Sequence, residues 1–289
     1  MIRRLTASDR NDVLEISKHT WDGHDYLMNV FDEWVNDPKC DFVGVAVGNR
    51  VVAVGNLHLI EAGRTGWLEG LRVHPEFRQR GYANEITAYL VAEGKRLGVE
   101  RLRYTTSDRN TESLKIAAKT GFSRVLELAV FWATGVKVLP SMRVRYSIQE
   151  MKPTELYDLL QKDDVLIPSG VLVYDWKVLE LNLENLEEIA KNHRFYATLK
   201  EGKADSLSFS HRRPDRTDQS WWSFTAYARD TEGILGQISY NMKAILENGL
   251  SSVIATFEKR FEDAVSNLEL GADEQEISHL VMLEKKIST

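Results

Sequence analysis

The spacing of apolar and polar residues divides the first half of the chain into alternating strands and helices. Apolar residues at every second position predict strands, and apolar residues every three to four positions predict helices. The predicted strands are 3–6, 42–47, 51–60, 66–73, 101–105 and 122–133, and the predicted helices are 8–19, 26–34, 82–97 and 111–119. The order is therefore β-α-α-β-β-β-α-β-α-β, with glycine-containing turns between the three central strands.

The second half of the chain echoes this order. Its predicted strands are 144–149, 195–200, 207–210, 221–227, 253–257 and 279–283, and its predicted helices begin at 153, 185, 234 and 259. The stretch around Asp175-Trp176 is interpreted as irregular, and residues 134–140 are the predicted linker. We therefore expect an α+β protein of two domains, 1–135 and 142–289, the second a diverged copy of the first, although no repeat of individual residues proves the duplication.

Composition and charge narrow the classes of function. The chain has 289 residues, 43% of them hydrophobic, and a net charge of −6, which is a soluble globular composition. The net charge is +1 before residue 140 and −7 after it, whereas a nucleic-acid-binding platform carries a basic face. The sequence has no apolar run long enough to span a membrane, and its start lacks the apolar core of a signal peptide. We expect a cytoplasmic protein that binds neither nucleic acid nor membranes.

The single cysteine and the histidines give no strong signal of a reactive or metal-binding site. Cys40 is expected to be a packing residue. His58 and His74 are interpreted as hydrogen-bonded structural residues, and no spacing of His, Asp and Glu resembles a metal site, so no metal is expected. The basic run 211–213 is interpreted as a solvated loop, and a contact from one of its arginines to a substrate carboxylate stays open.

One segment carries a specific chemical signal, and it joins a predicted strand to a predicted helix. The strand ends in Leu71-Arg-Val-His-Pro75, and the loop before the helix reads Arg78-Gln-Arg-Gly-Tyr-Ala83. Small residues at 81 and 83 allow close approach of the backbone to a ligand. The N–H groups at a helix start bind anions, and two arginines add positive charge. This arrangement suits a pyrophosphate.

The loop resembles the pyrophosphate loop of the GNAT acetyltransferases, which reads Arg/Gln-x-x-Gly-x-Gly/Ala. A second part of that family's signature is similar to Asn110-Thr-Glu-Ser113 together with Lys119-Thr-Gly-Phe122. The resemblance covers residues 2–130 and implies a mixed, mostly antiparallel sheet flanked by helices, with acetyl-CoA in a splay between the fourth and fifth strands. It assigns the cofactor to Leu71, Val73, Arg78, Gln79, Arg80, Gly81, Tyr82, Ala83, Asn110 and Ser113.

A closer resemblance, to the histidine N-acetyltransferase-like family, extends over the whole chain. It is carried by Asp25-Tyr-Leu27, Trp34 and Trp67-Leu-Glu-Gly-Leu-Arg-Val73, and more loosely by Pro168-Ser-Gly170, Asp175-Trp176 and Asn185-Leu186. The resemblance implies direct transfer of an acetyl group to the α-amine of a free amino acid. Two alternatives stay open, namely transfer to another small amine such as a polyamine, and a non-catalytic acyl-CoA-binding sensor. The oligomeric state is not indicated.

Glu69 is the predicted general base. Strict alternation along the strand places Trp67, Glu69, Leu71 and Val73 on one face, so that Glu69 lies beside the expected cofactor. An amine that is protonated at neutral pH must lose a proton before it attacks the thioester, and a carboxylate can accept that proton. Two alternatives are that Glu69 only anchors the ammonium of the substrate and that it is a structural ion-pair partner.

The acceptor is expected to contact Asp25, Tyr26, Trp67 and Glu69. The alternative for the first two is that Asp25 caps the second helix and Tyr26 packs in the core. Ala117 stands where many family members have a tyrosine that protonates the leaving thiolate, which leaves Ser113, Tyr82 or water for that role.

The second half of the chain is not expected to bind CoA. Its segment Arg229-Asp-Thr-Glu-Gly233 places two acidic residues where phosphates would lie. The aromatic residues around Trp176 and in Trp221-Trp222 are expected to serve in packing.

Overall fold

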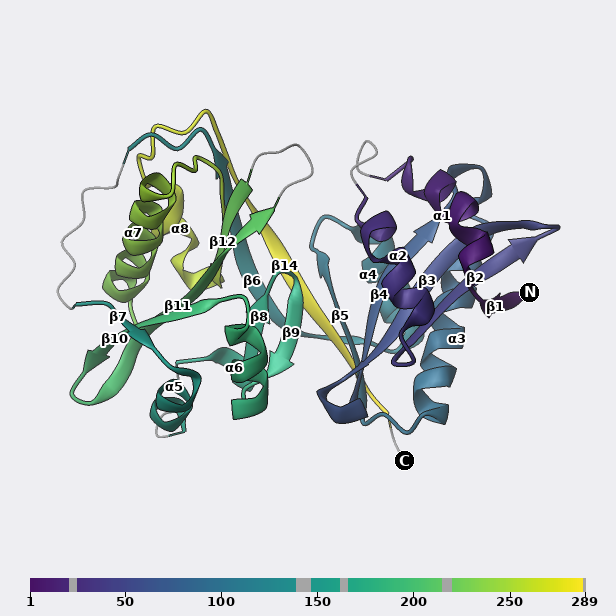
Figure 1. The fold of residues 1–289 in the computed structure, drawn as a ribbon, viewed down its shortest axis with the longest axis horizontal. Helices are drawn as coiled ribbons and strands as arrows, with labels where there is room; N and C mark the ends of the chain where they lie inside the picture. The colour runs from purple at the N-terminus through teal and green to yellow at the C-terminus, as the bar shows by residue number, and fades with distance from the viewer. Residues whose placement is uncertain (21–24, 139–146, 162–165, 215–219, 288–289) are drawn as a thin grey trace. The chain divides into compact units, whose positions relative to one another are not determined.

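The computed structural model describes residues 1–20, 25–138, 147–161, 166–214 and 220–287 (Figure 1). The chain forms two compact units. Unit 1 contains Met1–Tyr104, Asn110–Arg124 and Leu283–Thr289, and unit 2 contains Thr105–Arg109 and Val125–Met282.

Unit 1 is built on a sheet with the strand order β1-β2-β3-β4-β5. Neighbouring strands are antiparallel, except that β4 and β5 are parallel. Its strands are β1 (Ile2–Arg4), β2 (Cys40–Val47), β3 (Arg50–Ile60), β4 (Thr65–Val73) and β5 (Arg101–Ser107), and its helices are α1 (Arg10–Ser17), α2 (Leu27–Asn36), α3 (Tyr82–Arg96) and α4 (Thr111–Thr120). The order of elements is therefore the one that the sequence pattern predicts for this region.

Helices cover both faces of the unit 1 sheet. The apolar side chains of α1 and α2, among them Val13, Phe31 and Trp34, form a core with Phe42 and Val54 of the sheet. On the other face, α3 lies against Gly55 of β3. A Cβ atom at Gly55 would lie 2.6 Å from Ile86 of α3, so this close approach requires glycine.

A β-bulge interrupts β4 and corrects the predicted alternation of its side chains. The pairs Val54–Arg72 and Asn56–Glu69 leave one residue of β3 opposite two of β4, and Gly70 has a left-handed φ of 69°. Beyond Glu69 the predicted common face is therefore wrong. Arg72 contacts Asp25 on the α1–α2 face, whereas Leu71 lies near the Gly55 position on the α3 face.

The strands of unit 2 follow one another in the order β14-β6-β13-β12-β11-β10-β7. The pair β12–β13 is parallel, and β10–β11, β11–β12 and β13–β6 are antiparallel. Its strands are β6 (Ser123–Thr134), β7 (Gln149–Met151), β10 (Arg194–Lys200), β11 (Lys203–Pro214), β12 (Ser220–Ala228), β13 (Val253–Glu258) and β14 (Glu274–Lys286), and its helices are α5 (Pro153–Leu160), α6 (Leu183–Ala190), α7 (Thr231–Glu247) and α8 (Glu262–Ser266).

Two features of unit 2 differ from the sequence prediction. The stretch around Asp175-Trp176 is the two-residue turn of a hairpin between β8 (Val171–Tyr174) and β9 (Lys177–Glu180), which has no counterpart among the predicted elements. The strand predicted at 144–149 begins outside the described residues, and only its end coincides with β7. The turn was overlooked because neither of its residues is one of the glycines or asparagines that favour positive φ.

The two units do not coincide with the expected domains 1–135 and 142–289. Most of β6 belongs to unit 2, where it pairs with β13, and the last residues of β14 belong to unit 1. In unit 1, Glu284 of β14 forms an ion pair of 2.8 Å with Arg103, whose side chain is 6% exposed. The backbone N–H of Ile287 donates to the carbonyl of Glu100 at 2.9 Å. Each half of the chain thus contributes residues to the other unit.

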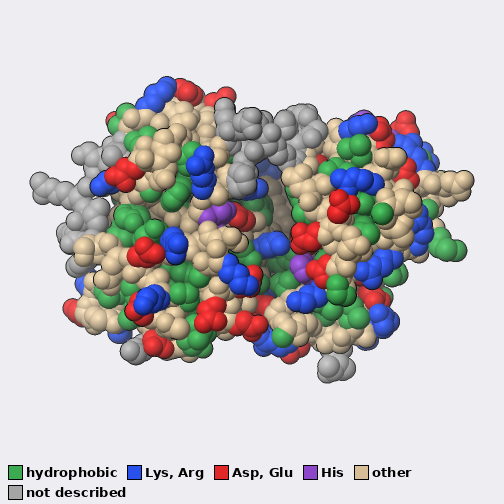
Figure 2. Space-filling model, in the orientation of Figure 1, with side chains coloured by type: hydrophobic (Ala, Val, Ile, Leu, Met, Phe, Trp, Pro, Cys, Tyr) green, Lys and Arg blue, Asp and Glu red, His purple; other side chains and the backbone are tan. Residues whose placement is uncertain are grey.

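The drawn face of the described residues (Figure 2) carries both signs of charge, and hydropathy indicates no membrane-spanning helix among them. On the face drawn in Figure 2, Lys and Arg side chains of the described residues are interspersed with Asp and Glu. None of the helices in the described ranges combines the length and the apolar character needed to cross a membrane.

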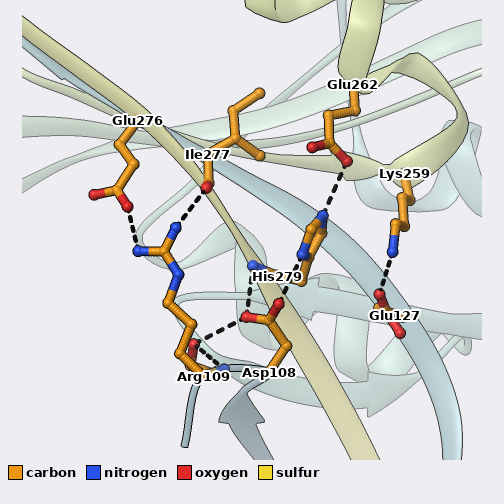
Figure 3. Close-up of polar contacts among 9 residues, drawn as sticks. Asp108, Arg109, Glu127, Lys259, Glu262, Glu276, Ile277 and His279 are labelled. Carbon is orange, nitrogen blue, oxygen red and sulfur yellow. Dashed lines mark hydrogen bonds and ion pairs between the residues drawn. The ribbon is translucent and has the colours of Figure 1, made fainter.

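A histidine between two carboxylates links three segments of unit 2 (Figure 3). His279 of β14 lies 2.9 Å from Asp108 through Nδ1 and 2.9 Å from Glu262 through Nε2. Burial by itself lowers the pKa of His279, but the hydrogen bonds to Glu262 and Asp108 outweigh it, so the net shift is upward. Beside it, Arg109 pairs with Glu276.

We expect His279→Gln to destabilise the protein more in acid than in alkali. Because folding raises the pKa of His279, its ion pairs stabilise the fold at pH values below about 6.5 and are lost as the pH rises through the folded-state pKa. The difference in Tm between wild type and variant should be larger at pH 5.5 than at pH 9. Glu276→Gln removes the neighbouring ion pair between a carboxylate and an arginine, and the Tm difference between wild type and this variant should be the same at both pH values. Equal differences for His279→Gln would contradict the prediction.

Candidate active site

The parallel ladder between β4 and β5 ends early and leaves part of β4 open. It joins Thr65 to Arg101, Gly66 to Leu102 and Trp67 to Arg103, whereas β4 continues to Val73. The β-bulge at Gly70 lies within this open stretch. The sheet therefore has the local separation of its fourth and fifth strands that the sequence resemblance implied.

The N-terminus of α3 lies in the same region, after the end of β4, and it is uncapped. Gly81 is the N-cap residue, with a φ of 88°, and no side chain accepts a hydrogen bond from the first turn. Apart from its chain neighbours, no heavy atom of the described residues lies within 4 Å of the position that a Cβ of Gly81 would occupy. Gln79, two residues earlier, also has a left-handed φ, of 61°. Unpaired N–H groups and open space make this helix start a fitting cradle for a pyrophosphate.

The side chains of Arg78, Gln79 and Arg80 are exposed, and the backbone carbonyls of Leu71 and Val73 in the preceding strand are already engaged. Arg78 Nε donates to the carbonyl of Val73 at 3.4 Å, and Arg80 lies over the ring of Phe77 at 4.9 Å. The carbonyl of Leu71 accepts from Arg72 at 2.9 Å. The structure thus brings the predicted residues 71, 73 and 78–83 together, and their contact with acetyl-CoA stays a prediction.

At the start of α4, the predicted cofactor residues have a capping role. Asn110 Oδ1 accepts from the backbone N–H of Ser113 at 3.1 Å. Ala117 is buried, and the nearby Tyr104 hydroxyl donates to the carbonyl of Ser113 at 3.3 Å. Burial raises the pKa of Tyr104. The contact of Asn110 and Ser113 with the cofactor stays a prediction.

Glu69 belongs to a cluster of polar side chains on the α1–α2 face. Its side chain is 11% exposed, and its Oε1 lies 3.4 Å from Asn56 Nδ2 and 3.6 Å from His58 Nδ1. The other ring nitrogen of His58 lies 3.8 Å from Asp37. Asn56 Oδ1 is buried and has no hydrogen-bond partner among the described residues. Burial raises the pKa of the adjacent Cys40 to about 11, which keeps the thiol protonated and unreactive at neutral pH.

The acceptor residues predicted at 25 and 26 are held in the protein interior. Asp25 has a side chain that is 0% exposed, forms an ion pair of 3.0 Å with Arg72 and accepts from the N–H of Leu27. Burial raises the pKa of Tyr26 to about 12, and the guanidinium of Arg72 lies 5.5 Å from its ring. These contacts are those of the alternative interpretation, capping and packing, and a direct contact of either residue with the acceptor stays a prediction. Trp67, also buried, pairs with His58 across β3 and β4.

The corresponding place in unit 2 is built differently. The ladder between β12 and β13 joins five residue pairs, from Trp222–Val253 to Ala226–Phe257. At the start of α7, Asp230 accepts from the N–H of Gly233 at 2.8 Å, and the first turn also carries Glu232. Within the described part of unit 2, this helix start is therefore capped by a carboxylate where α3 offers unpaired N–H groups.

Comparison with known proteins identifies the domain that carries this site. The sequence pattern of the family described as "Acetyltransferase (GNAT) family" matches residues 10–122, which include Glu69 and the loop 78–83. Residues 10–122 are a GNAT acetyltransferase domain. A tandem GNAT protein from the clavulanic acid biosynthesis pathway has the same fold, with a TM-score of 0.59 over 100% of this chain and 99% of that chain, at 15% sequence identity.

Curated relatives resemble the chain at low identity. The human protein called "Probable N-acetyltransferase 16" is 27% identical over 204 residues, which are 64% of this chain and 55% of the relative. The histidine N-acetyltransferase of Oreochromis niloticus is 22% identical over 205 residues, which are 64% of this chain and 61% of the relative. The chain therefore spans less than two thirds of the length of these relatives.

Sequence reasoning about the GNAT domain missed several members of the Glu69 cluster. Asn56 and Asp37 were not singled out, and His58 was assigned a structural role. The pairing of β3 with β4 places Asn56 opposite Glu69 and His58 opposite Trp67. The glycine in the middle of the β4 strand is the signal that was available for the bulge, because an isolated strand glycine often marks one.

We expect calorimetry to find one CoA per wild-type chain and none for Gly81→Glu. A glutamate at the uncapped start of α3 places a carboxylate where the phosphates bind. Gly48→Glu is the matched control, because Gly48 in the β2–β3 turn also has a positive φ, 60°, and open space around its Cβ position. The control should bind CoA normally. Unchanged affinity in folded Gly81→Glu, or a second equivalent bound by the wild type, would contradict this assignment.

Proposed function

We propose that the protein is an acetyl-CoA-dependent N-acetyltransferase that acetylates the α-amine of a free, histidine-like amino acid. The observation that carries the proposal is the pairing of an uncapped α3 N-terminus with an open stretch of β4 that contains Glu69. Membership of residues 10–122 in the GNAT family supports the reaction, and the similarity to histidine N-acetyltransferases supports the acceptor.

Acetyl-CoA, when bound, supplies the activated acetyl group. The loop 78–83 and the first turn of α3 hold its pyrophosphate through backbone N–H groups, and Arg78 and Arg80 add positive charge. The open part of β4 would lie beside the rest of the bound cofactor. Transfer is direct, because the thiol of Cys40 is buried and protonated.

Glu69 accepts the proton that the attacking amine must lose. It lies two residues beyond Trp67, where the ladder to β5 ends, and therefore at the point where β4 becomes accessible from the open side. Asn56 Oδ1, a buried acceptor beside it, is suited to a hydrogen bond from the amine. A carboxylate and an amide oxygen together orient an amine through its N–H groups.

A route for the proton leads from Glu69 through His58 to Asp37. The separations are 3.6 Å and 3.8 Å, longer than hydrogen bonds, so transfer requires these side chains to move closer or a bridging water. The side chain of Asp37 is 24% exposed and so connects the cluster with solvent.

Arg72 and Asp25 position the acceptor side of the site. Their ion pair packs against Tyr26 and fixes the strand directly after the bulge. A guanidinium beside the site is suited to the carboxylate of an amino acid, which a polyamine lacks. The departing thiolate is a good leaving group, and its proton comes from water or from a hydroxyl such as Tyr82 or Ser113.

We expect Glu69→Gln to lower kcat by roughly 10²–10⁴-fold without changing the affinity for acetyl-CoA. The variant keeps the shape of the side chain and removes its proton affinity, and the acidic limb of the pH–rate profile should disappear. Glu76→Gln, at an exposed position just after β4, is the control and should retain normal kinetics. If Glu69 only anchors the ammonium, KM rises while kcat stays near normal, and the assignment of the base fails.

A panel of amines with detection of released CoA thiol tests the acceptor. We expect release with histidine and related amino acids, at a rate that Glu69→Gln reduces to background. Release of thiol with polyamines but with no amino acid would contradict the proposed acceptor and support the alternative of another small amine. Binding of acetyl-CoA without release for any amine would favour the acyl-CoA-binding sensor.

A further inference from the structure

Two histidines and an aspartate meet in unit 2, far from the residues of the proposed acetyl transfer in the sequence. Asp175 lies in the β8–β9 turn, His193 follows α6, and His211 is on β11. Each offers a ligand atom within 4.8 Å of the others. The two imidazole rings have their centroids 4.0 Å apart. His193 is buried, and the side chains of His211 and Asp175 are 12% and 27% exposed.

Hydrogen bonds fix which nitrogen of each neutral ring presents a lone pair. His193 Nδ1 is 3.1 Å from the carbonyl oxygen of Ile189, which can only accept, so Nδ1 carries the proton and Nε2 presents the lone pair. His211 Nε2 is 3.0 Å from the carboxylate of Asp175, so its Nδ1 presents the lone pair. This Nδ1 is buried and has no hydrogen-bond partner among the described residues.

The surrounding structure holds these three groups in place. The β8–β9 hairpin lies on the face of β12 opposite to α7, where Thr225 donates to the carbonyl of Val173 and Ser223 donates to Asp175 at 2.9 Å. Asp175 and Trp176, the two turn residues, have left-handed φ values of 43° and 67°. For non-glycine residues this conformation is unfavourable. The turn thus holds Asp175 against His211 at some energetic cost.

We propose that His193 Nε2 and His211 Nδ1 bind a divalent transition-metal ion of the Zn²⁺ class, with Asp175 orienting the His211 ring. Both imidazoles have the second nitrogen bonded to a carbonyl or a carboxylate, which is how proteins hold metal-binding histidines. Imidazole ligands favour Zn²⁺, Co²⁺, Ni²⁺ and Cu²⁺ over Mg²⁺ and Ca²⁺. Solvent fills the remaining positions.

The bound ion would join three elements of unit 2: the end of α6, β11 and, through Asp175, the β8–β9 turn. Its role is then to stabilise this face of the sheet, independently of acetyl transfer. The charge of Arg213 acts on Asp175 and opposes a cation, so we expect moderate affinity. A second group, Asp37, Cys40 and His58, has similar spacing, but its thiol is held protonated and both nitrogens of its histidine face carboxylates.

Calorimetry on the tag-free, chelator-treated full chain tests the site with Zn²⁺ and Co²⁺ alone. The wild type should bind one equivalent at this site, show a visible Co²⁺ absorption band, and gain Tm on adding Zn²⁺. His211→Gln should lose all three responses. Asp175→Asn keeps the shape of the turn and should weaken binding by roughly 10–100-fold, as loss of a group that orients a ligand does.

His279→Gln and Asp37→Asn are the controls, because each removes a member of another His and carboxylate cluster. Both should retain the equivalent bound at His193 and His211. Circular dichroism and the metal-free Tm establish that each variant is folded. The proposal is overturned if the wild type binds no more Zn²⁺ than His211→Gln and Asp175→Asn do. It is also overturned if a control variant loses the bound Zn²⁺ ion while His211→Gln and Asp175→Asn keep it.

Discussion

The break in register between β3 and β4 at Gly70 determines where the groups of the GNAT domain site lie. One extra residue in β4 turns Leu71 toward α3 and Arg72 toward Asp25, while Glu69 stays opposite Asn56. Only glycine fits at position 70 of this bulge, because a Cβ atom there would lie 2.7 Å from the side chain of Trp34. The same stretch of β4 is the part without a ladder to β5. A local insertion of one residue thus places Arg72 on the same face as Glu69 and turns Leu71 to the opposite face.

The two units use one order of elements for different purposes. In unit 1 the helix after the fourth strand starts with an uncapped glycine, and in unit 2 the equivalent helix α7 starts with Asp230 as its cap. Behind α7, a buried network joins Ser208, Gln237 and Asn241 through bonds of 2.8 and 3.0 Å. Such a satisfied polar network fixes the packing of a helix on a sheet. At this place unit 2 therefore has a capped helix that is fixed by polar contacts, whereas unit 1 has a helix start that is open to a ligand.

Much of the fold follows from the sequence because strong local signals determine it. The helix from Tyr82 and the loop before it were predicted nearly to the residue, since glycine and the apolar period agree there. Alternation failed at Gly70 because a bulge depends on the partner strand. The cluster of Asp175, His193 and His211 left no trace in spacing, because a hairpin, a helix end and a strand bring them together only in the folded chain. Tertiary contacts of this kind leave no periodic pattern of residues in the local sequence.

Because the two halves of the chain exchange strand ends, unit 1 can be completed only late in biosynthesis. Arg103 meets Glu284 across 181 residues of sequence, so unit 1 cannot complete its β5 edge while the chain is half made. At 5–20 residues per second, translation from residue 124 to 283 takes roughly 10–30 s. Through that interval the outer edge of β5 is an unpaired strand, a template for association with other chains. Vectorial synthesis therefore exposes the first half to aggregation until the last strand emerges, and a chaperone that covers β5 would act within this interval.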